Sequence, residues 1–121
     1  MRVDQIFEQA KAAGAQPVSF EMFPPKGEMT LERAREVAGS FSQLNPDFIS
    51  VTYGAGGSTS KRTLELAARL QDAYHVPALA HLTCVSSTRE EVTQQVARLR
   101  AAGIGSILAL RGDIPQDTSF P

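Results

Sequence analysis

Residues 48–84 read FISVTYGAGGSTSKRTLELAARLQDAYHVPALAHLTC and contain one complete strand–helix–strand unit. The run FISVTY (48–53) has the β-branched and apolar composition of a strand, and GAGGS forms a flexible loop after it. Pro77 to Cys84 forms the next strand, and between the two strands a helix is marked by the apolar stripe Leu66, Ala67 and Leu70. Two strands joined through a helix are expected to run parallel in one sheet.

The same unit precedes this stretch. Residues 17–23, PVSFEMF, resemble a strand that ends at Pro24-Pro25, because proline lacks the backbone N–H that a sheet needs. A helix follows from about Thr30 to Asn45-Pro46, with the apolar face Ala34, Val37, Ala38, Phe41 and Leu44. Before the strand, Val3 to Ala13 is predicted to be a helix that Gly14 ends, with Ile6, Phe7, Ala10 and Ala13 at helical spacing.

A further helix and a fourth strand follow residue 84. Thr88 and Glu91 have the spacing of a capping box at a helix N-terminus, and the helix is expected to end near Gly103. Its apolar stripe is Val92, Val96 and Leu99. Ser106 to Leu110 is predicted to be the fourth strand. Strands that alternate with helices at about thirty residues per unit are typical of an α/β protein with a parallel sheet.

Alternation within the strands favours a barrel over an open doubly wound sheet. One predicted face is small or polar and carries Ser19/Glu21, Ser50/Thr52, Leu79/His81/Thr83 and Ala109/Arg111/Asp113. The other is predicted to pack on helices and carries Phe20/Met22, Ile49/Val51, Ala80/Leu82 and Leu108/Leu110. A (β/α)8 barrel needs eight units and about 250 residues. We therefore expect residues 1–121 to be half of a barrel, an incomplete domain from a fragment or a shortened reading frame. A monodisperse, cooperatively unfolding monomer would contradict this.

Composition excludes several classes of function. The 121 residues contain 12 Lys and Arg and 13 Asp and Glu, so no basic surface for nucleic acid or an anionic membrane is expected. No apolar run approaches the length of a membrane span. The single Cys84 excludes an internal disulfide, and the charged start MRVDQIFEQA does not resemble a signal peptide. A cytoplasmic protein is expected.

Polar or ionisable residues follow the four apolar runs at intervals of about thirty residues: Glu21, Thr52, His81 and Asp113. The carboxyl ends of parallel strands open onto one face, so these side chains are predicted to converge on one site. These four residues do not indicate a metal site, because a metal site needs several His, Cys, Asp or Glu residues at the spacing of metal ligands. His75, the other histidine, is expected at a solvent-exposed helix end.

Glu21 is the candidate general acid. A carboxylate within an apolar strand is costly to bury unless it is paired or protonated, and a protonated carboxyl group is what a general acid requires. The alternative is a carboxylate that is merely solvated at the rim of the sheet. For His81 the alternative is a hydrogen-bonded core histidine, and for Arg111 and Asp113 it is a surface ion pair. The glycines 54, 56 and 57 before a helix suit an anion, but a flexible turn explains them equally well.

Four sequence blocks resemble one family. SFEMFPPK (19–26), VTYGAGGST (51–59), AHLTC (80–84) and ALRGDIP (109–115) occur in the order and spacing of the N-terminal portion of bacterial methylenetetrahydrofolate reductase. The resemblance covers essentially the whole chain. It implies an FAD-dependent (β/α)8 barrel in which NAD(P)H reduces the flavin, and the reduced flavin converts 5,10-methylenetetrahydrofolate to 5-methyltetrahydrofolate.

The resemblance also implies residue roles. Glu21 corresponds to the proton donor that helps to open the folate ring to an iminium, and Asp113 lies near the isoalloxazine and the folate. FAD contacts are implied for Tyr53, Ala55, His81, Arg111, Gly112 and Asp113, and Thr52 lies near the nicotinamide. Alternatives are an inactive remnant or interaction unit of this family and, less favoured, a folate-binding barrel of a methyltransferase. A C-terminal half or a homo-oligomer would complete the site, and the chain alone is expected to hold FAD poorly.

Overall fold

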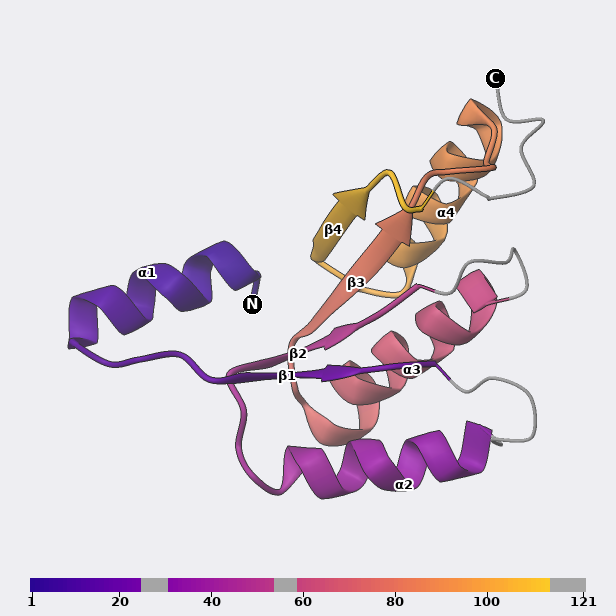
Figure 1. Cartoon of the computed structure of the whole chain (residues 1–121). Helices are drawn as coiled ribbons and strands as arrows, with labels where there is room; N and C mark the ends of the chain where they lie inside the picture. The colour runs from indigo at the N-terminus through magenta and orange to yellow at the C-terminus, as the bar shows by residue number, and fades with distance from the viewer. Residues whose placement is uncertain (25–30, 54–58, 114–121) are drawn as a thin grey trace.

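The computed structural model describes residues 1–24, 31–53 and 59–113. Helix α1 precedes four strands that alternate with three further helices (Figure 1). The elements in chain order are α1 (Val3–Ala13), β1 (Ser19–Met22), α2 (Leu31–Ser42), β2 (Phe48–Val51), α3 (Thr59–Tyr74), β3 (Ala78–Thr83), α4 (Arg89–Ala101) and β4 (Ser106–Leu110). The predicted α/β class is confirmed.

The strands form one parallel sheet in the order β1-β2-β3-β4. Met22, Val51, Ala80 and Ile107 are aligned across it, as are Glu21, Ser50, Leu79 and Ser106 in the adjacent row. Aligned residues of parallel strands point to the same face, and successive residues of a strand point to opposite faces. The sheet therefore has a helix-facing side, which includes the Met22 row, and an inner side, which includes the Glu21 row.

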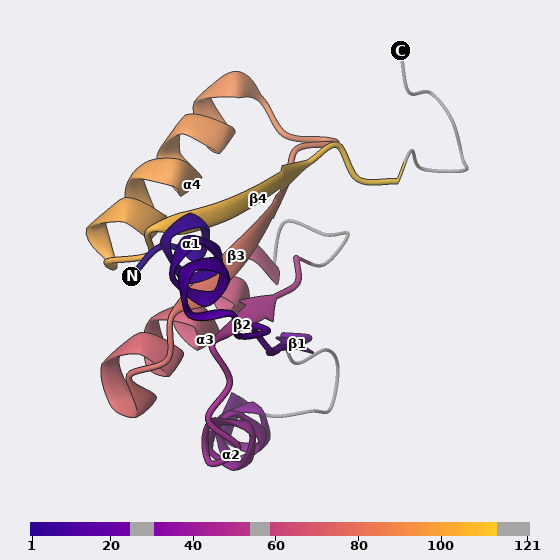
Figure 2. The same cartoon turned by 90° about the vertical axis from the view of Figure 1, so that its left-hand side faces the viewer.

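Helices α2, α3 and α4 lie on one side of the sheet, and α1 lies at the N-terminal ends of the strands (Figures 1 and 2). The main core fills the space between the sheet and α2 and α3. Its largest fully buried side chains are Ile49, Val51, Leu66 and Leu70. Helix α1 meets the inner side only at the N-terminal ends of the strands, where Phe7 contacts Phe48 and the Val3 N–H donates to the Ser106 hydroxyl. No described element covers the inner side toward the carboxyl ends, so side chains there are open to ligands or to further protein.

Helix boundaries follow the predicted signals. Gly14 ends α1 in the left-handed conformation with φ 65°, and the predicted Val3–Ala13 range is confirmed. At the start of α4, the Thr88 hydroxyl accepts a hydrogen bond from the Glu91 N–H, and the Glu91 carboxylate accepts one from the Thr88 N–H. The predicted capping box is thus confirmed. The predicted start of α2 at Thr30 lies outside the described residues.

Strand boundaries differ from the predictions by one or two residues at most ends. The strand predicted over 48–53 ends at Val51. Beyond it the Thr52 N–H still donates to the Met22 carbonyl of β1, whereas the Thr52 carbonyl accepts a hydrogen bond from the Thr63 side chain. Of the predicted apolar positions in α1, only Ile6 is buried. Phe7 is half-exposed, and its ring contacts that of Phe48 edge-to-face, with 6.1 Å between the ring centroids.

The predicted faces of β4 are wrong. Leu108 is aligned with His81 and Leu110 with Thr83, so both leucines lie on the inner side; Ala109 is aligned with Leu82 on the helix-facing side. The leucines are 47% and 37% exposed. Side-chain alternation shows which residues share a face, but the pairing with β3 decides which face that is. The inner side of the sheet is therefore apolar along β4 and polar along β1 and β2.

Candidate functional site

Three polar side chains from neighbouring strands meet on the inner side of the sheet. The Ser50 hydroxyl, on β2, donates to Oε1 of Glu21 on β1 at 3.5 Å. Nε2 of His81, on β3, lies 3.6 Å from the same oxygen. The structure thus brings together Glu21 and His81, as the sequence predicted.

The register of the sheet explains this convergence. Glu21 is aligned with Ser50, and Ser50 with Leu79. His81 is the next residue of β3 on the same face as Leu79, one step closer to the carboxyl end. Its imidazole can therefore reach over β2 toward Glu21. When the imidazole is protonated, this contact becomes an ion pair.

The burial of the two ionisable side chains differs. The Glu21 side chain is 52% exposed, and that of His81 is 15% exposed. The expectation that Glu21 is buried is wrong for this chain, because β1 is the edge strand and no described strand lies on its outer side. A half-exposed carboxyl group with a hydroxyl donor and an imidazole beside it can exchange protons with a ligand on the inner side.

Thr52 and Tyr53, which follow β2, lie in different surroundings. The carbonyl of Thr52 accepts a hydrogen bond of 2.9 Å from the buried hydroxyl of Thr63, which fixes the end of β2 to α3. The Tyr53 hydroxyl donates to Oε1 of Gln95 on α4 at 3.1 Å. The Tyr53 side chain is therefore directed to the helix layer and does not join the Glu21 cluster.

The segment Arg111-Gly112-Asp113 follows β4 and is held to the end of β3. The Val85 N–H donates to the Arg111 carbonyl at 2.7 Å. Gly112 has φ 88°, and a Cβ built there would lie 2.8 Å from Cγ1 of Val85 and closer still to Cγ2 of Thr83. Only glycine fits this backbone and this close approach.

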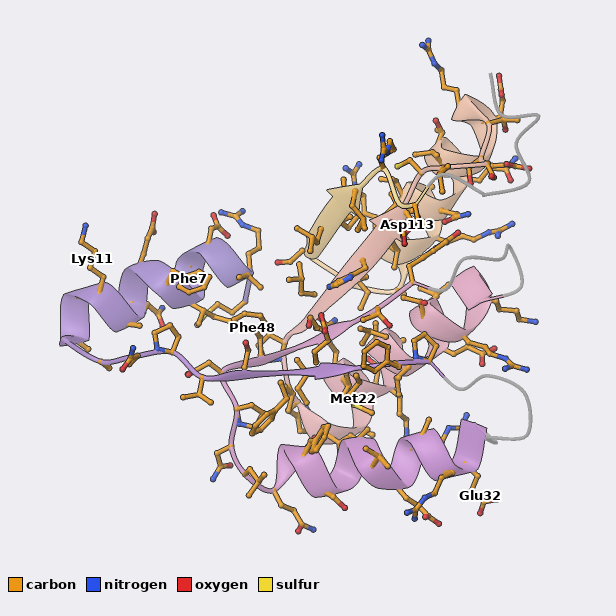
Figure 3. The ribbon with its side chains drawn as sticks, viewed as in Figure 1. Phe7, Lys11, Met22, Glu32, Phe48 and Asp113 are labelled. Atoms are coloured by element: carbon orange, nitrogen blue, oxygen red, sulfur yellow. The ribbon has the colours of Figure 1, made fainter. Side chains whose placement is uncertain are left out.

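The charged residues on either side of Gly112 are exposed. Nε of Arg111 donates to the Gly112 carbonyl at 3.1 Å. Within the described ranges Arg111 and Asp113 form no ion pair, so the surface-pair interpretation is wrong. Figure 3 shows Asp113 beyond β4, near the carboxyl end of β3. No hydrogen bond or ion pair among the described residues links Asp113 to Glu21 or His81.

Several expectations concern other parts of the chain. Ala55 and the glycines 54, 56 and 57 lie outside the described residues. His75 is exposed directly after α3, as predicted. The part of the chain that the structure describes contains no group of three or more His, Cys, Asp or Glu placed to hold a metal ion. None of its helices is both long and apolar enough to cross a membrane.

For three residues of these networks the sequence indicates no partner. Side-chain alternation places Ser50 on the correct face, but its alignment with Glu21 depends on the register of the two strands. Thr63 and Gln95 carry no local signal, because a hydroxyl or amide on a helix becomes a partner only when the fold brings a strand end to it. Such contacts depend on tertiary packing.

Comparison with known proteins identifies relatives along nearly the whole chain. A family described as "Methylenetetrahydrofolate reductase" matches residues 6–120. A "Probable methylenetetrahydrofolate reductase (NADH)" of Oryza sativa is 39% identical over 115 residues, which are 95% of this chain and 19% of the rice protein. The "5,10-methylenetetrahydrofolate reductase" of Escherichia coli is 35% identical over 112 residues, which are 93% of this chain and 38% of that protein. The chain therefore spans about a fifth to two-fifths of the length of these relatives. Its four parallel strands and alternating helices are consistent with part of a (β/α)8 barrel, and the chain belongs to the methylenetetrahydrofolate reductase family.

Proposed function

We propose that this chain contributes the first four strands, with the helices that connect them, of a cytoplasmic barrel that reduces 5,10-methylenetetrahydrofolate to 5-methyltetrahydrofolate with NAD(P)H and FAD. The observation that carries the proposal is the meeting of Glu21, Ser50 and His81 on the inner side of a parallel sheet. In barrels of parallel strands, ligand sites lie at the carboxyl ends of the strands. Family membership supplies the reaction class.

The inner side has the chemistry that a flavin needs. Leu108 is level with His81 and is 47% exposed, so an apolar surface lies beside a hydrogen-bonding imidazole. At the end of β4, Gly112 keeps the backbone free of a side chain, and Arg111 provides an exposed cation. A planar ring system with polar edges and an anionic tail fits such surroundings. FAD, when bound, would supply hydride transfer between the nicotinamide and the folate.

Glu21 is proposed to be the general acid of the folate step. Its carboxyl group is accessible from the inner side, and Oε1 is held by Ser50 and His81. A proton delivered from this carboxyl group to a folate nitrogen would assist opening of the five-membered ring. In the complete barrel, a strand beside β1 would exclude water from Glu21.

The remaining roles follow the same proposal. Thr52 lies at the carboxyl end of β2 and would face the nicotinamide. Tyr53 would contact FAD through its main chain, because its hydroxyl is bonded to Gln95. Asp113 would face the flavin ring and the folate, where its negative charge favours a cationic intermediate of the folate. Ala55 is proposed as a further FAD contact.

The activity is proposed for the completed barrel. Strands β1 and β4 have edges without a described partner, and unpaired edges readily accept another strand. A C-terminal half, in the same polypeptide or in a complementing chain, or a homo-oligomer would close the sheet. The competing proposal is an inactive remnant or interaction unit, and it is favoured by the exposed state of Glu21 and of the leucines on β4.

The test is to express the chain alone and together with the C-terminal half of the bacterial relative from Escherichia coli, and then to desalt both preparations. We expect flavin absorbance and folate-dependent oxidation of NAD(P)H from the complemented barrel, and neither from the chain alone. Complemented protein that binds FAD but oxidises NAD(P)H with no dependence on 5,10-methylenetetrahydrofolate would contradict the proposed substrate. A complemented protein that neither binds FAD nor oxidises NAD(P)H would favour the proposal of an inactive remnant.

A further inference from the structure

A pocket of about 350 Å³ lies between α3 and α4 on the helix-facing side of the sheet. Its apolar walls come from Leu64 on α3, Leu82 on β3 and Leu99 on α4. Leu82 is on the helix-facing side of β3, and the pocket also reaches Tyr53 and His81 near the carboxyl end of the sheet. A volume of this size is within the range of sites for small molecules.

The polar groups of the pocket are mainly donors. Lys61 on α3 and Arg98 on α4 line it, and within the described residues neither forms an ion pair. Gln95 accepts the hydrogen bond of Tyr53 with its oxygen, which leaves its NH₂ group as a donor. None of the described lining residues is acidic.

The position of Lys61 on α3 is consistent with this electrostatic character. Lys61 is in the first turn of the sixteen-residue helix α3, where the unpaired N–H groups give the helix its positive end. The nearest acidic residue along α3 is Glu65, which is exposed and does not line the pocket. A negatively charged group in the pocket would therefore meet two cations and an amide donor.

We propose that this pocket binds a small organic anion whose apolar or aromatic body lies against Leu64, Leu82 and Leu99. The charged group, a phosphate ester or a carboxylate, lies between Lys61 and Arg98 and accepts a hydrogen bond from Gln95. Such a ligand combines a charge-assisted contact with burial of apolar surface. Because Tyr53 and His81 also border it, the pocket adjoins the proposed flavin site, but the anion proposal does not depend on the proposed reaction.

The test is a titration of the isotope-labelled chain followed by NMR. Phenyl phosphate and benzoate serve as probes that distinguish a phosphate ester from a carboxylate. We expect at least one of them to shift the Gln95 side-chain amide and the methyl groups of Leu64, Leu82 and Leu99 saturably. Lys61→Gln or Arg98→Gln should weaken binding about tenfold, because each removes one charge-assisted hydrogen bond.

Two matched variants control for general loss of positive charge. Arg100→Gln changes a cation in the same last turn of α4 as Arg98, and Arg69→Gln changes one on α3; neither residue lines the pocket. Both should leave the affinity within a factor of about two. If circular dichroism shows that a pocket variant fails to fold, the affinity of the unaltered chain is measured at several ionic strengths instead. This affinity should fall as ionic strength rises.

Other probes supply the results that would overturn the proposal. Inorganic phosphate binding as tightly as phenyl phosphate would indicate charge attraction without a pocket, and benzyl alcohol binding as tightly would indicate that the cations have no role. Absence of saturable shifts with both anions would refute the site. In the complemented barrel, competition between phenyl phosphate and FAD would place the pocket within the flavin site and would refute a second ligand site, without affecting the proposed function.

Discussion

Nε2 of His81 lies 3.6 Å from Oε1 of Glu21, although the two residues are on strands separated by β2. Ser50, on the intervening strand, donates to the same oxygen. The carboxyl group of the edge strand is thus held toward the middle of the inner side, where the proposed folate and flavin would lie. This placement makes Glu21 the residue whose replacement best separates the two steps of the proposed reaction.

Glu21→Gln in the completed barrel should leave flavin reduction by NAD(P)H unchanged and should slow folate reduction by about 10²-fold or more, because the amide keeps the shape but cannot donate the proton. Stopped-flow absorbance of the flavin measures each step separately. Glu32→Gln, an exposed change in the first turn of α2, is the control. Equal rates of folate reduction in both variants would refute the assignment of Glu21.

Asp113→Asn in the same barrel should raise the reduction potential of bound flavin. A nearby carboxylate disfavours the electron-rich reduced form, and the neutral amide removes that effect. Spectroelectrochemical titration of both proteins gives the potentials. A potential that stays the same or falls would show that Asp113 is not close to the flavin ring.

Gly112→Ala should destabilise the chain by about 2–4 kcal/mol, because the residue has φ 88° and the new methyl group would overlap Thr83 and Val85. Urea unfolding gives the free energy. Gly14→Ala is the matched control: its φ is 65°, but a Cβ there has no atom within 4 Å, so only the backbone cost of about 1 kcal/mol is expected. Combining Gly112→Ala with Thr83→Ser should recover part of the loss, and equal effects of the two glycine variants would exclude the steric explanation.

Thr63→Val should reduce the free energy of unfolding by about 1–3 kcal/mol. The substitution keeps the shape of a side chain that is 2% exposed but removes its hydrogen bond to the Thr52 carbonyl. Thr93→Val is the comparison, since Thr93 donates to the Arg89 carbonyl on the exposed side of α4. Its effect should stay within about 0.5 kcal/mol. A larger loss of unfolding free energy in Thr93→Val than in Thr63→Val would mean that the end of β2 is not anchored through Thr63.

Asp4 should make a small pH-dependent contribution to stability. The hydrogen bond from the Arg2 side chain lowers the pKa of Asp4 below its ordinary value of 3.8. Because the pKa is lower in the folded state, the contribution is complete above pH 3.8 and is lost as the pH falls through the folded-state value. Asp4→Asn should therefore flatten the acid limb of a plot of unfolding free energy against pH, and an unchanged limb would contradict this role.

Much of the candidate site could be predicted because strand ends in a parallel sheet must share one edge. That rule placed Glu21 and His81 together without any knowledge of their contacts. It could not place Tyr53, which follows the strand by two residues and is directed to Gln95 on the helix side. Nor could it predict the exposure of Glu21, which depends on whether another strand lies beside β1.

The sequence by itself determined the order, type and approximate limits of the elements, because helical and strand periodicity, the Thr88–Glu91 cap and the turn at Gly14 are encoded within a few neighbouring residues. Only the tertiary structure decided that Leu108 and Leu110 lie on the inner side, and that Ser50 joins Glu21 and His81. The physical reason is that a strand's alternation has two equivalent orientations. Hydrogen bonding to the neighbouring strand, a contact between residues distant in sequence, selects one of them.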